Sequence, residues 1–181
     1  MLKKLFLSVV LVVLLIGGVV FFIAMVNESG NSEMQSFRSE QYNLAFQYPT
    51  DYTLTEHVLN AAQRYHVQEV LIDKDWQEPK DGEGPPAIIF GVYQNNLDQF
   101  TAEQWIRNNS ASNFKLSDEK LIPVELDGAK GFMYHWDGLY PAEEIVVAKG
   151  DNIYYIIVMY LNFTDDIIDD FKRILPTVDL D

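Results

Sequence analysis

The chain has 181 residues, of which 27 are acidic and 13 basic, and it contains no cysteine. This length suits one ordinary domain with an appendage and is short for two full domains. The absence of cysteine excludes disulfide bonds, thiolate metal sites, a cysteine nucleophile and a lipid-modified cysteine. The net charge of −14 argues against binding to nucleic acid or to anionic lipid, because both need a basic surface.

Residues 5–26 form an uncharged apolar stretch of 22 residues, LFLSVVLVVLLIGGVVFFIAMV. As a helix it would measure about 33 Å, enough to cross a hydrocarbon core of about 30 Å. Lys3 and Lys4 precede it and the next basic residue is Arg38, so the positive-inside rule places residues 1–4 in the cytoplasm and the rest of the chain outside. The stretch therefore predicts one transmembrane anchor in the cell membrane.

Two other interpretations of residues 5–26 stay open. A cleaved signal peptide usually has an apolar stretch of about 7–15 residues before a small-x-small site. This stretch is longer and ends in Ala24-Met25-Val26, which does not fit such a site. A buried core helix is the other alternative, but core helices are rarely apolar on every side over this length.

The remaining chain predicts a linker and one extracytoplasmic domain. Residues 27–36, NESGNSEMQS, are polar and lack apolar periodicity, which is typical of a flexible linker. Residues 37–181 are long enough for one well-buried core. Residues 27–181 carry 27 acidic and 11 basic side chains, and their net charge of −16 suits a soluble surface that gathers cations.

Alternation of apolar and polar residues predicts mostly strands in this domain: an opening hairpin, two further strands, a buried central strand and two more hairpins. The expected ranges are 37–41 with 43–48, then 52–58, 65–72, 87–93, 121–126 with 129–136, and 144–148 with 152–161. Asp127-Gly128 favours a two-residue hairpin turn, and residues 149–151 predict the last turn. Residues 59–62 also suit a helical turn, and the Pro/Gly-rich residues 79–86 predict a surface loop.

Two helices are expected. Thr101-Ala102-Glu103-Gln104 has the pattern of a capping box at the start of a helix that runs to about Asn109. A second helix begins near Thr164 and stops at Pro176, with one apolar stripe made by Ile167, Ile168, Phe171, Ile174 and Leu175. These elements together predict an α+β fold, an antiparallel β-sheet flanked by helices.

The order of these elements resembles the PsbP-like superfamily, which includes the extrinsic PsbP subunit of photosystem II and bacterial membrane-anchored relatives. The resemblance is carried by YNLAFQYP at 42–49, by strands at 131–134 and 152–157, and by the closing helix. It implies a six- or seven-stranded antiparallel sheet in an α/β/α sandwich and a non-enzymatic role in binding or assembly. No functional residue is carried over, because the matched positions are structure-forming.

The closing helix holds the candidate metal-binding residues, which are two pairs of aspartates four positions apart: Asp165 with Asp169, and Asp166 with Asp170. Like charges at this spacing repel each other on a helix. A bound calcium or manganese ion would relieve the repulsion, because hard cations prefer carboxylate oxygens. The alternative is a solvated acidic face at the positive end of the helix dipole. We therefore expect weak divalent cation binding at most, and no other cofactor.

Aromatic residues are the candidates for contact with a protein partner. Trp76 follows a predicted strand beside the expected loop, and Tyr134 and Tyr154 lie within predicted strands. Aromatic side chains that a fold leaves uncovered commonly bind a partner. Tyrosines in strands also suit packing within a sheet, so both interpretations stay open.

We expect a membrane-anchored extracytoplasmic domain that acts as a non-enzymatic binding or assembly module of an envelope complex. Its partners would be the membrane, through the N-terminal helix, and an envelope protein. Two alternatives are an envelope hydrolase that uses surface carboxylates and a structural subunit whose anchor packs through Gly17-Gly18. A carboxylate pair with a raised pKa would favour the hydrolase, and an uncovered aromatic patch would favour the binding module.

Overall fold

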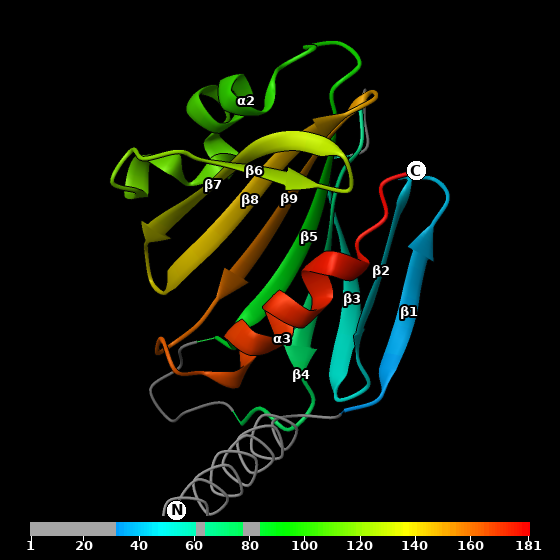
Figure 1. The fold of residues 1–181 in the computed structure, drawn as a ribbon, viewed down its shortest axis with the longest axis vertical. Coiled ribbons are helices and arrows are strands. Elements are labelled where there is room, and N and C mark those ends of the chain that lie inside the picture. Colours follow the sequence, from blue (N-terminus) through cyan, green and yellow to red (C-terminus); the bar gives the residue numbers. More distant parts are fainter. Residues whose placement is uncertain (1–31, 61–63, 78–83) are drawn as a thin grey trace, which may run out of the picture. The chain divides into compact units, whose positions relative to one another are not determined.

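In the computed structural model, which describes residues 32–60, 64–77 and 84–181, seven antiparallel strands form one sheet in the order β3-β4-β5-β9-β8-β7-β6 (Figure 1). All elements described here belong to the unit Met34–Asp181. The strands are β3 (Tyr52–Asn60), β4 (His66–Asp73), β5 (Ala87–Gln94), β6 (Ile122–Leu126), β7 (Ala129–Asp137), β8 (Pro141–Lys149) and β9 (Asn152–Met159). The apolar run expected to be a central strand is β5, which lies between β4 and β9.

The opening hairpin forms a separate two-stranded sheet of β1 (Met34–Ser39) and β2 (Leu44–Pro49). The predicted hairpin is thus confirmed, although β1 begins at Met34, inside the range expected to be linker. Asn43 takes the left-handed conformation that the turn requires, with φ of 49°. Phe46 stacks on Phe90 of the large sheet with ring centroids 3.8 Å apart, which holds the hairpin against that sheet.

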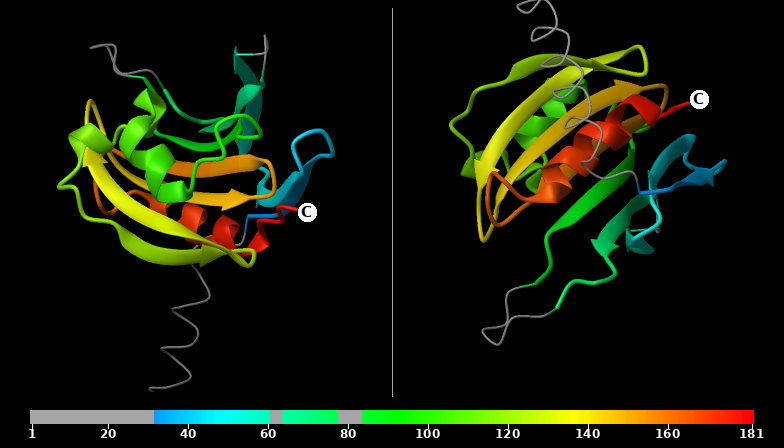
Figure 2. Two further views of the ribbon diagram at one scale, coloured as in Figure 1. Left: turned by 90° about the horizontal axis from the view of Figure 1, so that it is seen from above. Right: turned by 60° about the horizontal axis from the view of Figure 1, so that its bottom comes forward.

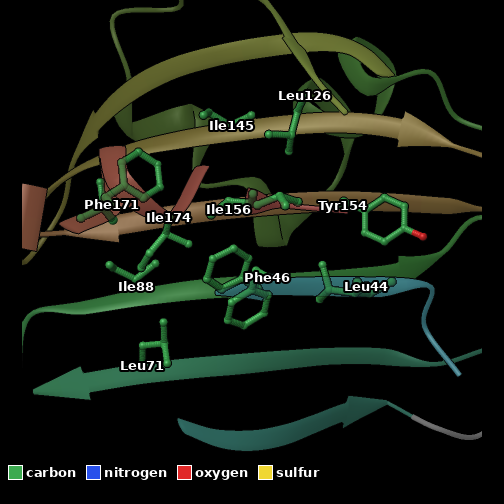
Figure 3. Packing of buried hydrophobic residues seen from close by; sticks show 14 of the residues in the cluster. Leu44, Phe46, Leu71, Ile88, Leu126, Ile145, Tyr154, Ile156, Phe171 and Ile174 are labelled. Atoms are coloured by element: carbon green, nitrogen blue, oxygen red, sulfur yellow. The ribbon is translucent and has the colours of Figure 1, made fainter. Parts of the chain in front are cut away.

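Helices cover both faces of the sheet, as the two views of Figure 2 show. The hairpin and α3 (Asp166–Ile174) lie on one face, and the expected apolar stripe of α3 is buried there. Figure 3 shows Phe46 of the hairpin and Phe171 and Ile174 of α3 within this core. On the other face, α2 (Ala102–Asn108) is followed by the 3₁₀ turns Ser110–Ser112 and Phe114–Leu116; a third 3₁₀ turn, Leu175–Thr177, extends α3.

Local sequence signals are confirmed where they depend on a few neighbouring residues. The backbone N–H of Gln104 donates to Oγ1 of Thr101 at 3.2 Å, and the N–H of Thr101 donates to Oε1 of Gln104 at 2.9 Å, which completes the capping box. Asp127 and Gly128 connect β6 to β7 with φ of 46° and 72°, as a type I′ turn requires.

Two local expectations need correction. Lys149 pairs with Asn152, so the turn between β8 and β9 consists of residues 150–151 and not 149–151. Leu59 and Asn60 belong to β3 and not to a helical turn, because the strand pairs with β4 as far as Asn60. The remainder of that expected turn, residues 61–62, lies outside the described residues.

The predicted transmembrane anchor, residues 5–26, also lies outside the described residues. Among residues 32–60, 64–77 and 84–181, no helix combines the length and the apolar character needed to cross a membrane. Within that part of the chain the fold is a mostly antiparallel sheet with few helices.

Candidate functional site

Glu56 and Glu69 form a pair of carboxyl groups on β3 and β4, at one edge of the large sheet (Figure 1). The two residues lie directly opposite each other in the strand register. Glu69 alternates with Val67 and Leu71, which are buried in the core that includes the β1–β2 hairpin. Because alternate residues of a strand share a face, the pair lies on the hairpin side of the sheet.

The two carboxyl groups differ in their environment. Glu56 is exposed, whereas Glu69 is only 2% exposed and its Oε2 has no hydrogen-bond partner among the described residues. Burial, followed by the negative charge of Glu56 and a hydrogen bond between the two carboxyl groups, raises the pKa of Glu69 to about 7. Glu69 therefore keeps its proton in about half of the molecules at neutral pH.

Two tyrosines of the hairpin face this pair. Burial raises the pKa of Tyr42, and the charges of Glu56 and Glu69 add to the effect. Burial and then Glu69 raise the pKa of Tyr48, so both phenols are neutral at pH 7. Within the part of the chain that the structure describes, no Lys, Arg or His forms an ion pair with either glutamate.

The sequence alone does not reveal this pair, because its members are 13 positions apart and meet only through the register of β3 with β4. The strand sequence HVQEVLID does contain one indication that Glu69 is buried. Glu69 occupies the position between Val67 and Leu71 where the alternation requires an inward-facing side chain. A glutamate at such a position indicates a buried carboxyl group.

A second buried acid, Glu144 of β8, lies in the core under α2. It is 0% exposed, and its Oε2 accepts a hydrogen bond from Nε1 of Trp136 at 3.0 Å. Its Oε1 has no partner among the described residues, nor has Nε1 of the buried Trp105. Burial raises the pKa of Glu144 well above its ordinary value, although the nearby hydroxyl of Tyr134 and the hydrogen bond from Trp136 oppose the shift. Burial therefore favours the protonated form of Glu144, and the residue is part of the core under α2.

The aspartates expected to bind a cation on α3 have partners of their own. Asp165 is the N-cap of the helix, and its Oδ2 accepts hydrogen bonds from the backbone N–H groups of Leu161 and Asn162, both at 2.8 Å. Asp169 is exposed and pairs with Lys172 at 3.0 Å. These contacts occupy one carboxylate oxygen of each residue.

Asp166 and Asp170 complete that expected site. Asp166 lies in the first turn of α3. Asp170 is half-buried; one of its oxygens accepts from the hydroxyl of Tyr52 and the other from Nη1 of Arg173, both at 3.0 Å. Asp170 thus links α3 to β3. Cation binding by the four aspartates stays a prediction.

The structure brings together a different set of acids: Asp127, Asp179 and Asp181 have oxygens within 4.8 Å of one another. A lysine already lies among them, since Nζ of Lys149 is 2.8 Å from Asp127 and 2.5 Å from Asp181. Arg38 pairs with Asp179 at 3.1 Å. These two cations offset two of the three negative charges, and their ion pairs connect the C-terminal residues to the β6–β7 turn.

The three aromatic residues expected to contact a partner differ in how deeply their side chains are buried. Trp76 is half-buried in the segment after β4. Tyr134 is 0% exposed and donates to the carbonyl oxygen of Ser112, and Tyr154 is buried and donates to that of Tyr42 at 3.0 Å. Tyr134 and Tyr154 therefore pack within the two cores, because both faces of the sheet are covered. Of the three, Trp76 alone has a partly exposed side chain.

Four large apolar side chains are exposed near one end of the sheet, where β7 meets β8 and β9 leads to α3; Val58, Leu59 and Leu97 are exposed toward the opposite end. Tyr160 at that end follows β9, and its N–H donates to the carbonyl oxygen of Pro141 at 3.2 Å, which joins the two loops. Leu139 is 74% and Phe163 80% exposed. We call this surface the apolar end; it comprises Leu116, Leu139, Leu161 and Phe163.

The sequence of the chain matches none of the protein-family models and none of the curated proteins with which it was compared. Its structure is similar to the solution structure of cyanobacterial PsbP (CyanoP) from Synechocystis sp. PCC 6803, with a TM-score of 0.55. The similarity covers 86% of this chain and 96% of that protein, at 10% sequence identity. The chain therefore has the PsbP-like fold, as the resemblance in its sequence implies.

Proposed function

We propose that this protein is a membrane-anchored extracytoplasmic module that binds a protein partner within an envelope complex, without catalysing a reaction. The PsbP-like fold supports a domain of the binding or assembly type. The anchor is supported by the 22 uncharged residues 5–26 and by the lysines that precede them. The observation that carries the proposal is the apolar end.

The apolar end has the character of a docking surface. Soluble proteins bury most of their large apolar side chains, and contiguous exposed ones mark sites of interaction. Phe163 is held in place by Tyr160, whose ring centroid lies 5.4 Å away, and it nevertheless leaves 80% of its surface uncovered. An aromatic side chain of this kind, together with Leu139, suits the centre of a protein interface.

The hydrolase alternative has one observation in its favour, the carboxyl pair with a raised pKa at Glu69. Hydrolysis by two carboxyl groups requires that both reach the scissile bond. Glu69 is 2% exposed, which leaves Glu56 as the accessible member of the pair. The burial of Glu69 thus favours the binding module.

Site-specific photo-crosslinking in native membranes tests the proposal. A photoreactive amino acid is placed at Phe163 or Leu139 in the full chain, and at Leu97 as a matched control. Leu97 is 63% exposed and lies after β5, at the opposite end of the sheet. We expect the same membrane protein to be crosslinked at positions 163 and 139 and not at 97. Crosslinking to lipid alone, or equal yields at all three positions, would contradict the proposal.

A protease protection assay tests the topology separately. In cells whose outer layers are opened, residues 37–181 should be digested by added protease while the cell membrane remains intact. Full protection of these residues would place them in the cytoplasm and would contradict the predicted orientation. This result is independent of the partner, so the two parts of the proposal can fail separately.

A further inference from the structure

The carboxyl pair of β3 and β4 includes a buried oxygen that no described residue hydrogen-bonds. Like charges directly opposite each other on neighbouring strands repel. Glu56 and Glu69 are placed in this way, and Oε2 of Glu69 is buried without a hydrogen-bond partner among the described residues. Buried polar atoms of this kind are uncommon in folded proteins, and a bound ion or water is a frequent reason for them.

We propose that the paired carboxyl groups of Glu56 and Glu69 form a binding site for a hard divalent cation, for which Ca²⁺ is the probe. The two groups offer up to four oxygens, and calcium commonly completes its shell of about six to eight oxygens with water. Glu56 is exposed, so an ion and its water molecules can reach its carboxyl group from the solvent, and Glu69 lies directly opposite it. The site lies within β3 and β4, and it is independent of the proposed membrane anchor and protein partner.

The surroundings of the pair favour a cation over other ligands. Within the described residues no basic side chain forms an ion pair with either glutamate, unlike the cluster around Lys149, where a cation is already present. The titratable groups that face the pair from the covering hairpin are Tyr42 and Tyr48, and both are neutral at pH 7. The acidic surface of the chain adds a general attraction for cations.

A proton competes with the ion for this site. Burial and the neighbouring carboxyl group raise the pKa of Glu69 to about 7, so Ca²⁺ must displace a proton from part of the molecules at neutral pH. With one competing proton, affinity should be about tenfold lower at pH 6 than at pH 8. Binding at pH 7 should release a fraction of one proton.

Isothermal titration calorimetry of the full chain in detergent micelles tests this site. We expect one Ca²⁺ per chain at pH 8, with a Kd of about 0.1–1 mM, the range of extracellular calcium modules. Affinity should fall about tenfold at pH 6. Titrations at pH 7 should give different binding heats in two buffers of different ionisation enthalpy, because the buffer takes up the proton that Ca²⁺ displaces. No binding heat at pH 8 would overturn the proposal.

Matched variants locate the ion. Glu69→Gln should abolish binding and Glu56→Gln should weaken it, while Asp169→Asn on α3 should bind as the unaltered protein does. Glu69→Gln replaces a buried acid by a neutral group of the same shape, and far-UV circular dichroism confirms that it is folded. Retained binding in Glu69→Gln together with loss in Asp169→Asn would place the ion on α3 and overturn the proposal.

Discussion

Tyr155 of β9 lies directly opposite Gly91 of β5, and its ring fills the space that a side chain at Gly91 would need. The ring stacks on Trp105 of α2, and its hydroxyl lies 2.7 Å from Nε2 of His66. The absence of a side chain at Gly91 therefore lets one tyrosine connect β4, β5, β9 and α2. This contact anchors the core under α2.

Gly91→Ala should destabilise the protein by about 1–3 kcal/mol, the usual cost of overpacking a core. A Cβ atom at Gly91 would lie 1.9 Å from Cζ of Tyr155, so the ring must move from its place against Trp105. Urea unfolding followed by tryptophan fluorescence measures the change. Gly84→Ala is the control, because no heavy atom lies within 4 Å of a Cβ there. Equal effects of the two substitutions would contradict this account.

Glu69 should make the protein less stable as the pH rises from about 4.5 to about 7. Its pKa in the folded state is about 7, above the ordinary value of 4.5, so in this range the folded state holds a proton that the unfolded state has released. Rising pH therefore favours unfolding, and the loss levels off about one pH unit above the folded-state pKa. We expect a full contribution of about 3 kcal/mol.

Comparison with Glu69→Gln isolates this contribution. Urea unfolding without divalent cations at pH 5 and at pH 8 gives the free energy of unfolding of both proteins. The variant should gain about 2 kcal/mol relative to the unaltered chain between these pH values, because glutamine has no proton to lose. Glu144 is present in both proteins, so its titration cancels. A difference that does not change with pH would contradict the raised pKa.

Asp170→Ala should destabilise the protein by about 1–3 kcal/mol, because it removes the acceptor for Tyr52 and for Arg173 in a half-buried place. Asp169→Ala should change the stability by less than about 0.5 kcal/mol, since Asp169 is exposed and its pair with Lys172 is a surface ion pair. Thermal unfolding of both variants makes the comparison. A larger effect at Asp169 would contradict the assignment of Asp170 as the link between α3 and β3.

Features that depend on short stretches of sequence could be predicted. The capping box at Thr101 and the turn at Asp127-Gly128 form as expected, because each is decided by two to four neighbouring residues. The apolar stripe of α3 also predicts its buried face. The start of β1 was missed, because MQS at 34–36 is too polar to indicate a strand and is extended through pairing with β2.

The candidate site could not be predicted in the same way. Glu56 meets Glu69 through a register that depends on the whole β3–β4 pair, and one-residue slips would send the two side chains to the other face. The sequence suggests Tyr134 and Tyr154 as contacts for a partner because it does not show that helices cover both faces of the sheet. That burial follows from α2 packing on one face and α3 with the hairpin on the other.

Trp136→Phe should destabilise the protein by about 1–3 kcal/mol, because it removes the hydrogen bond that Nε1 of Trp136 donates to the buried carboxyl group of Glu144. The smaller phenyl ring also fills less space than the indole, which adds to the destabilisation. A double-mutant cycle with Glu144→Leu separates the contribution of the hydrogen bond from that of the lost volume. In the Glu144→Leu background, Trp136→Phe should lower the free energy of unfolding by less, because that background has no buried carboxyl group to lose its hydrogen-bond donor. Equal costs in both backgrounds, measured by urea unfolding, would show that packing alone accounts for the effect of Trp136→Phe.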